Sequence, residues 1–431
     1  MLLSEKLLQH IWRYRLYDVR DLCTTQGEPV SVIHPGILNT HAGPDFLQAR
    51  VQIGNTLLAG HVEIHLKTSD WERHGHAVSP AYGNLILHVV FENDAVASTA
   101  LPPHVPTLEL QQYIPKLLLE RYEQLMQAMH FVPCSPRLSL VDELTWLGWK
   151  DRMLVERMQE RTALFRQWLQ ESNGNWQEIF YRAMARSFGL PVNADAFEDL
   201  SRSLSVRILT AHKPQLPHLE ALLLGQAGLL AETFTEEYPR YLQQEYRFFQ
   251  SKYRLQPLAS HRWKWLRMRP AAFPTIRLAQ FAKLVHQSSH LFSRILEAHT
   301  IEQLCRMLEV TASPYWDDHY RLEKPSVSSP KKLGISTVHR IVINTVVPML
   351  FLYGTEMSLP QYREHAMALL RALPAEQNKI TAQWKQAGVT NLSAWDSQAL
   401  LHLRKAYCDH KLCLDCGIGN KILRTKENKT S

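Results

Sequence analysis

A change of sequence pattern near residue 100, from short strand-like runs to helical periodicity, constrains the fold of this chain more than any other feature. Short β-branched runs at residues 30–33, 49–53, 57–67 and 84–91, separated by turn residues, predict a small sheet. Before them, Ser4 is followed by apolar residues at helical spacing, which predicts an opening helix over residues 4–17. Helical periodicity then dominates residues 116–407. We therefore expect an α+β fold, with a small mixed sheet module followed by a large irregular all-α domain.

The 431 residues are enough for two or three domains with cores of their own. We expect an N-terminal α/β module over residues 1–100 and a Pro-rich linker over residues 101–115. A helical domain should follow over residues 116–407, then a Cys-rich knot at 408–419 and a frayed basic tail at 420–431. The sequence does not indicate an oligomeric state.

The composition, 45% apolar and 21% charged, is typical of a folded globular protein. The formal net charge of +7 favours an anionic partner such as nucleic acid. No apolar run approaches the roughly 18 residues of a membrane span, so we expect a cytoplasmic protein without a membrane partner. The six cysteines lack the even distribution of a secreted disulfide framework, which predicts reduced thiols.

The segment GHVEIHLK at residues 60–67 predicts a strand with one apolar and one polar face, because strand side chains alternate. The polar face carries His61, Glu63, His65 and Lys67. Such a face can be merely solvated, as in any half-exposed strand. Here acidic and imidazole residues also cluster in the flanking segments THAGPDF and SDWERHGH, which favours a functional site.

Three of these side chains form a donor set for a metal ion. Asp45, which follows Pro44, and Glu63 supply hard oxygen ligands, and His65 supplies a nitrogen. This mixture suits Mg²⁺ or Mn²⁺ and can also accept Zn²⁺. A divalent cation held there could bind phosphate oxygens and activate water.

The order of these parts resembles the restriction-endonuclease-like nuclease core: a helix that carries an acid, an Asp after Pro, and then a strand with Glu-x-Lys. The resemblance implies that Glu5 is the helix acid and that Asp45 and Glu63 hold the catalytic metal. The lysine of that pattern is His65 in this chain, and Lys67 lies on the same strand face as a substitute. It further implies a metal-dependent phosphodiesterase that acts on nucleic acid.

Two other functions remain open at this point. His65, His74, His76 and His88, with Glu63, could form a His-rich metal site of a hydrolase or oxygenase that acts on a small molecule. His88 lies in an otherwise apolar strand, where a hydrogen-bonded core histidine is the simpler interpretation. Alternatively, the protein is a non-enzymatic scaffold that presents surfaces to nucleic acid or to another protein.

A second metal site is predicted near the C-terminus. Cys408, Cys413 and Cys416 follow a C-x4-C-x2-C spacing, which brings together half of the cysteines of the chain within nine residues. Such spacing is typical of zinc or iron–sulfur ligation. A fourth ligand must come from elsewhere, either His410 within the loop or Cys134 in the distant segment FVPCSP.

Several phrases together resemble an uncharacterised bacterial family, a conserved domain of unknown function. They are AGPDF, VEIH, SDWERHGH, NLILHVV, RPAAFPTIRLAQFA, INTVVPMLFLYG and YCDHKLCLDCGIG, and they span residues 5–419. This resemblance covers nearly the whole chain but implies no particular activity.

Overall fold

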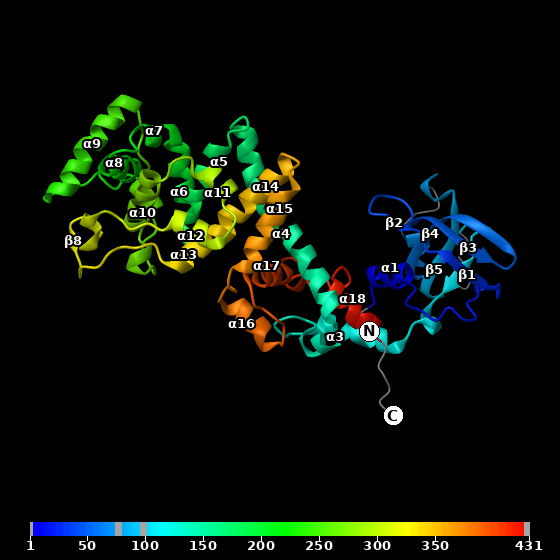
Figure 1. Cartoon of the computed structure of the whole chain (residues 1–431). Coiled ribbons are helices and arrows are strands. Elements are labelled where there is room, and N and C mark those ends of the chain that lie inside the picture. Colours follow the sequence, from blue (N-terminus) through cyan, green and yellow to red (C-terminus); the bar gives the residue numbers. More distant parts are fainter. Residues whose placement is uncertain (1–2, 74–79, 95–100, 426–431) are drawn as a thin grey trace. The chain divides into compact units, whose positions relative to one another are not determined.

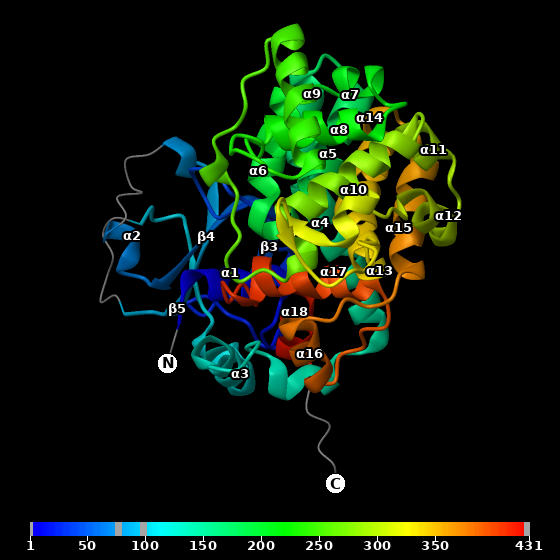
Figure 2. The same ribbon diagram turned by 90° about the vertical axis from the view of Figure 1, so that its left-hand side faces the viewer.

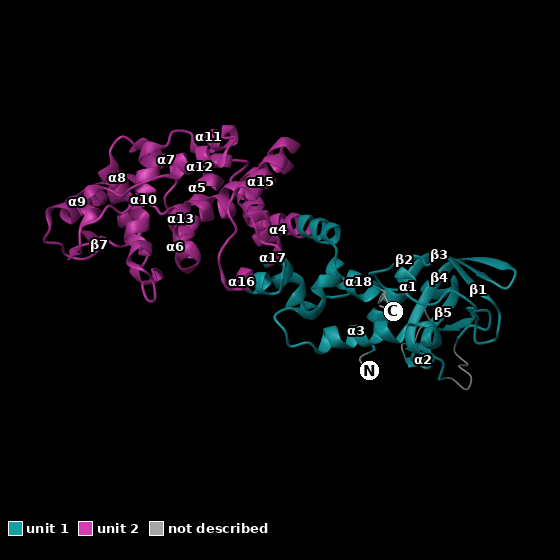
Figure 3. Ribbon diagram, turned by 60° about the horizontal axis from the view of Figure 1, so that its bottom comes forward, with its two compact units in different colours: residues 1–151, 383–389, 401–431 teal, residues 152–382, 390–400 magenta. Residues whose placement is uncertain are grey.

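The computed structural model describes residues 3–73, 80–94 and 101–425, which form two compact units (Figure 3). Unit 1 comprises residues 1–151, 383–389 and 401–431, and unit 2 comprises residues 152–382 and 390–400. Unit 1 contains a mixed sheet with an opening helix, and unit 2 is almost entirely helical, so the predicted α+β class is confirmed. The C-terminal segment returns to unit 1, a long-range contact that local sequence patterns cannot indicate.

The sheet of unit 1 has the strand order β1-β3-β4-β5-β6, with β2 paired to β3, and β4 lies at its centre (Figure 1). Strand β3 runs antiparallel to both β1 and β4, whereas β5 runs parallel to both β4 and β6. The strands are β1 (Val30–His34), β2 (Ile37–Leu38), β3 (Phe46–Ile53), β4 (Thr56–Lys67), β5 (Leu85–Glu92) and β6 (Thr107–Glu109).

The opening helix α1 (Glu5–Tyr14) packs against β4 (Figure 1). The side chain of Ser4 accepts a hydrogen bond from the Leu7 N–H at 3.2 Å, so Ser4 is the N-cap of α1. The apolar stripe of α1 is buried, as its helical spacing predicted. Val62 and Ile64 of β4 are also buried. The polar residues Glu63 and His65 alternate with them along the strand, so their side chains lie on the opposite face of the sheet.

Two boundaries differ from the prediction. The expected linker 101–115 contains strand β6, and its Val105, Leu108 and Leu110 are buried because β6 extends the sheet beside β5. The expected basic tail contains most of helix α18 (Gly417–Arg424), whose Ile418 and Ile422 are buried. The boundary between the units instead falls within the long helix α4 (Glu143–Glu171).

The remaining elements of unit 1 are short. They are α2 (Asp70–Arg73), η2 (Pro80–Tyr82), η3 (Gln111–Tyr113), α3 (Lys116–Gln127), η4 (Ser135–Leu140) and the π-helical turn η9 (Arg404–Cys408).

Unit 2 is built from helices packed in pairs, and α8 packs against both α9 and α10 (Figures 1 and 2). Helix α8 is buried from Leu219 to Gln226, as expected for a helix rich in apolar residues around its circumference. Helix α6 begins directly after Gly189 and carries Pro191 in its first turn. Proline is accommodated there because an N–H at that position would have no partner within the helix.

The helices and short elements assigned to unit 2 or shared with unit 1 are α5 (Trp176–Phe188), α6 (Leu190–Ser203), α7 (Val206–Ala211), α8 (Leu216–Gln226), α9 (Glu237–Tyr253), η5 (Ser260–Arg262), η6 (Pro270–Ala272), α10 (Pro274–Gln287), α11 (Leu291–Glu297), α12 (Ile301–Leu308), η7 (Pro314–Asp317), α13 (Ile335–Ile341), η8 (Val342–Val346), α14 (Val347–Glu356), α15 (Pro360–Ala372), α16 (Lys379–Gln386) and α17 (Ala394–Leu403), with the small hairpin β7 (His319–Arg321) and β8 (Lys324–Pro325).

One continuous helical stretch of the described residues, Ile335–Glu356, is long and apolar enough to cross a membrane by length and composition. This corrects the expectation that no run approaches such a length. Because 67% of its apolar window is buried inside the protein, the stretch has the character of a core helix.

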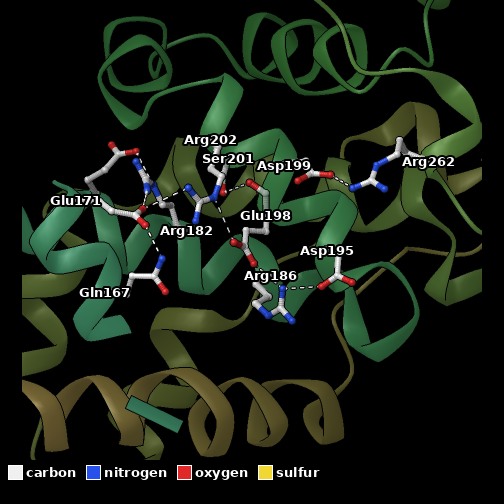
Figure 4. A network of polar contacts seen from close by, with 11 residues as sticks. Gln167, Glu171, Arg182, Arg186, Asp195, Glu198, Asp199, Ser201, Arg202 and Arg262 are labelled. Atoms are coloured by element: carbon white, nitrogen blue, oxygen red, sulfur yellow. Dashed lines mark hydrogen bonds and ion pairs between the residues drawn. The ribbon is translucent and has the colours of Figure 1, made fainter. Parts of the chain in front are cut away.

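The charged residues near α4, α5 and α6 form a network of ion pairs (Figure 4). Arg186 pairs with Asp195 at 2.8 Å and with Glu198 at 2.6 Å. Arg202 reaches the same Glu198 at 3.2 Å and Glu171 at 3.3 Å. Each of these pairs joins opposite charges and is partly solvated, so each contributes about 0–1 kcal/mol to stability.

Candidate functional site

Two acidic side chains meet where β3 begins beside β4. Asp45 directly precedes β3 and Glu63 lies in β4, and the antiparallel pairing of Phe46 with Val62 sets them side by side. The Asp45 N–H donates to Glu63 Oε2 at 3.0 Å, and the Ile64 N–H donates to Asp45 Oδ2 at 3.0 Å. The structure therefore brings together the two carboxylates that the sequence had singled out.

Helix α1 adds a third acid and an amide to this pair. Gln9 Nε2 donates to Asp45 Oδ1 at 2.8 Å. Glu5 lies one helical turn earlier on the same side of α1 and is half-buried. Its negative charge raises the pKa of both Asp45 and Glu63, so Glu5 lies within electrostatic reach of both. Sequence reasoning missed Gln9, although its i+4 spacing from Glu5 was a usable signal.

The two strands that carry the pair are both irregular next to it. In β3 the register shifts between Phe46 and Ala49, and Gln48 adopts a left-handed conformation with φ +57°. In β4 the pairing with β5 shifts between His61 and Val62. Bulges of this kind bend a strand and redirect its side chains, and they occur often next to active sites.

Gly60 permits the close approach of β5 to β4 just before the pair. A Cβ atom at this position would lie 2.5 Å from the backbone oxygen of Asn84 and 2.5 Å from Ile86 Cγ2. Neither contact is tolerable, so any larger residue would push the two strands apart.

Burial and like charge together raise the pKa of both acids. Burial is the main cause that raises the pKa of Asp45 to about 6, against hydrogen bonds that lower it. For Glu63, burial first and the charge of Asp45 second raise the pKa to about 8. At neutral pH and without a cation, Glu63 therefore holds a proton.

His65 lies next to Glu63 and is oriented by a second histidine. Its Nε2 lies 3.6 Å from Glu63 Oε1, and its Nδ1 shares a hydrogen bond of 2.9 Å with Nε2 of His88 on β5. Both rings are fully buried, and Trp71 packs edge-on against each of them. His88 is thus a hydrogen-bonded core histidine, and it directs the Nε2 edge of His65 toward the acidic pair.

Tyr82 is a further member of the site. Its ring packs edge-on against Trp71 at 5.6 Å between centroids. Burial first, and then the charges of Glu63 and Asp45, raise the pKa of Tyr82 to about 12, so the phenol remains protonated near the acids. No local sequence signal links Tyr82 to Glu63.

The other predicted residues have separate environments. Lys67 is exposed at the last pair of the β4–β5 ladder, and its ammonium lies 3.5 Å from Glu92 and 3.9 Å from Asp94. His61 Nδ1 accepts a long hydrogen bond from the Gln48 N–H at 3.4 Å. His74 and His76 lie outside the described residues, so their predicted role as metal ligands stays a prediction.

The fourth-ligand candidate Cys134 and the cysteines Cys408, Cys413 and Cys416 all lie in unit 1. Over the described ranges, no group of three or more His, Cys, Asp or Glu side chains is arranged to hold a metal ion as it stands.

The acidic pair nevertheless has the donor chemistry that a hard divalent cation requires. Magnesium is commonly held by only one or two carboxylates, with waters and substrate phosphates as its remaining ligands. Asp45 and Glu63 have oxygen lone pairs beyond those used by their backbone and Gln9 hydrogen bonds. A cation near them would also offset the repulsion that raises the pKa of both groups.

Comparison with known proteins assigns the chain to a family. The family model described as "Protein of unknown function (DUF2851)" matches residues 5–379. The chain belongs to this family. The match includes α1, the whole sheet and nearly all of unit 2, and it ends before the three C-terminal cysteines. No curated protein matches the chain, and no solved structure matches it.

Proposed function

We propose that this member of the DUF2851 family is a metal-dependent phosphodiesterase that cleaves nucleic acid at the Asp45–Glu63 site. The observation that carries the proposal is the buried pair of like charges, with Glu5 as a third acid nearby. Two adjacent buried carboxylates oppose folding unless something compensates their charge. Without a cation, a proton on Glu63 compensates the charge, and a bound divalent cation would replace that proton and allow both carboxylates to ionise. A scaffold without a catalytic ion does not require such a pair.

Each residue of the site has a role that follows from its contacts. Asp45 and Glu63 would hold a divalent cation such as Mg²⁺ or Mn²⁺, and Gln9 and the Ile64 N–H keep Asp45 in place. When bound, such an ion polarises phosphate oxygens and lowers the pKa of water. His65 would accept the proton of the attacking water, because its Nε2 edge lies beside Glu63 and its other nitrogen is occupied by His88.

Tyr82 would serve as a hydrogen-bond donor in this site. Because the pKa of its hydroxyl is raised to about 12, the group stays protonated over the working pH range. A protonated phenol near the acids can donate to a phosphate oxygen, which helps to hold the scissile group close to His65.

A polyanionic substrate agrees with the charges around the site. The chain has a formal net charge of +7. A surface hollow on the sheet is lined by His34, Arg50 and His61, among other residues, and His61 lies two positions before Glu63 on β4. Cationic and imidazole side chains along a groove contact phosphates without sequence specificity.

The decisive experiment is a cleavage assay on the purified full chain. Single-stranded, duplex and structured DNA and RNA are incubated with Mg²⁺, with Mn²⁺ or with a chelator. We expect cleavage that needs the ion and that is lost in Glu63→Ala. Glu109→Ala is the matched control, since Glu109 is a half-buried acid in the same sheet, on β6. The Glu109→Ala control should cleave all these substrates as the unaltered chain does.

The assay also separates this proposal from the scaffold alternative. If every substrate stays intact with either ion and Glu63→Ala behaves identically to the unaltered chain, the phosphodiesterase proposal is wrong. Retained nucleic-acid binding in that case would indicate the scaffold.

A further inference from the structure

Four of the six cysteines come from distant parts of the sequence and lie near one another in unit 1. Cys134 precedes η4, Cys408 ends the turn η9, and Cys416 is the N-cap of α18, with Cys413 in the loop between them. All four thiols are free of disulfides. Cys134, Cys413 and Cys416 are buried, at 7–8% exposure, so the thiols face the interior and not solvent.

Side chains of the C-terminal segment bind backbone carbonyls of the segment that precedes Cys134 and hold the two segments together. Arg404 Nη1 donates to the Phe131 carbonyl oxygen, and its guanidinium lies 4.9 Å from the centre of the Phe131 ring. Lys411 Nζ donates to the Met126 carbonyl oxygen. Helix α18 also packs against η4, directly after Cys134. Cys134 is thus brought to the C-terminal cysteines by a built interface that spans about 270 residues of sequence.

The loop that carries the C-terminal cysteines is a tight, well-bonded turn. The Lys411 N–H donates to the Cys408 carbonyl at 3.1 Å, and Lys411 is left-handed with φ +51°. Asn420 Nδ2 donates to the Leu414 carbonyl at 2.8 Å and to the Cys416 carbonyl at 3.0 Å. A Cβ at Gly419 would lie 2.2 Å from the Cys413 carbonyl oxygen, so only glycine permits this turn. The backbone therefore holds the cysteine positions closely.

The thiols are near enough to influence one another electrostatically. Burial raises the pKa of Cys408 well above its ordinary value, and Cys416, Cys134 and Cys413 raise it further. Burial likewise raises the pKa of Cys134 to about 12, with further contributions from Cys416 and Cys413. The four thiols therefore lie within electrostatic reach of one another.

We propose that Cys134, Cys408, Cys413 and Cys416 form one tetrathiolate metal site, which holds Zn²⁺ or an iron–sulfur cluster and joins helix α18 to the 126–140 segment. Cys134 supplies the fourth ligand that the C-x4-C-x2-C spacing lacks. The family match ends at residue 379, before the three C-terminal cysteines, and assigns no metal site. For zinc, the binding step is M²⁺ + 4 RSH → [M(SR)₄]²⁻ + 4 H⁺, so four S–H protons are released to solvent.

The surroundings suit the charge of such a centre. A tetrathiolate zinc site carries a net charge of −2, and Arg404 and Lys411 supply two positive charges beside it. The sulfur atoms as they stand are not yet gathered about one point among the described residues. Ligation would draw the four sulfur atoms to about 2.3 Å from zinc.

The test begins with the metal content of the full chain, purified without chelators. We expect about one zinc per chain, or iron with acid-labile sulfide and visible absorption; either result supports the site. Cys134→Ser and Cys408→Ser should each lose most of this metal. Cys305→Ser is the control, because Cys305 is half-buried in α12 of unit 2, and it should retain the metal in full.

A second measurement does not depend on whether the variants fold. In the unaltered chain unfolded in denaturant, removal of the metal should make four additional thiols reactive toward a thiol-reactive dye. Co²⁺ added to the folded, metal-free chain under reducing conditions should give thiolate-to-cobalt absorption. The Glu63→Ala variant should behave identically, which separates this site from the acidic one. Absence of both metal and cobalt–thiolate absorption, or full metal retention in a folded Cys134→Ser variant, would overturn the proposal.

Discussion

Two buried glutamates, one in each unit, have the same chemistry but opposite surroundings. Glu220 lies on α8 of unit 2 and is fully buried. Its Oε2 accepts hydrogen bonds from the Tyr238 hydroxyl at 2.9 Å and from the Trp316 indole at 3.0 Å. Glu63 of unit 1 is almost as buried, but the groups that act on its charge include Asp45 and Glu5, which are acids themselves.

The difference separates a structural acid from a candidate catalytic one. Burial raises the pKa of both glutamates, so a raised pKa alone does not identify a functional site. Two aromatic donors bind the Oε2 atom of Glu220, which suits a neutral carboxyl in a core. Glu63 faces like charge, and a cation would stabilise that arrangement. The groups around a buried acid therefore indicate its role better than its burial does.

The largest expected effect is on cleavage. Asp45→Asn and Glu63→Gln each remove one charge while they keep the shape of the site, so each should slow ion-dependent cleavage by about a hundredfold or more. The double variant should be little slower than the slower single variant, because both acids act on the same ion. Rates measured under single-turnover conditions test this. Fully multiplicative losses would mean that the two acids work independently.

Glu220→Ala should instead lower the stability of the fold without directly lowering the cleavage rate. The Tyr238 and Trp316 donors would be left without their acceptor in the core, and a cavity would form. We expect a destabilisation of about 2–4 kcal/mol. Denaturant unfolding measures this change, and cleavage per folded molecule should remain normal. A variant as stable as the unaltered chain would show that those hydrogen bonds contribute nothing.

The pH dependence of stability should also distinguish the acidic pair. In the unfolded chain the two acids titrate near 3.8 and 4.5, and in the folded chain near about 6 and about 8. The folded state therefore binds protons more tightly, and the contribution of the pair to stability falls as the pH rises from about 4 to about 8.

Glu63→Gln removes most of this dependence. In the presence of a chelator, the variant should be more stable than the unaltered chain by about 1–3 kcal/mol at pH 9, and the difference should shrink toward pH 5. Thermal unfolding across this pH range provides the measurement, with Glu109→Gln as the control. Added Mg²⁺ should stabilise the unaltered chain more at pH 9 than at pH 5. An equal stabilisation at the two pH values would contradict the proposed pair.

The smallest expected effect is at Gln9. Gln9→Ala removes one hydrogen bond to Asp45 but leaves the acids in place, so cleavage should fall by about tenfold or less. Arg13→Ala serves as the comparison on the same helix, because Arg13 is exposed. If both variants cleave at the same rate, Gln9 has no positioning role.

Local patterns in the sequence determined several parts of this protein. Ser4 and the apolar spacing after it specified α1, and the alternation in GHVEIHLK specified a strand with Val62 and Ile64 in the core. These features depend on neighbours within a few residues, where backbone geometry sets which side chains share a face. For the same reason Glu63 and His65 could be singled out together.

Only the tertiary structure decided which distant groups meet. Gln9 contacts Asp45 across 36 positions, His65 contacts His88 across 23, and Arg404 brings the Cys408 segment to Phe131 across 273. Each of these contacts arises because separate elements pack together, and no periodicity within one element encodes it. The raised pKa values follow from the same packing, since burial and the approach of Asp45 to Glu63 exist only in the folded chain.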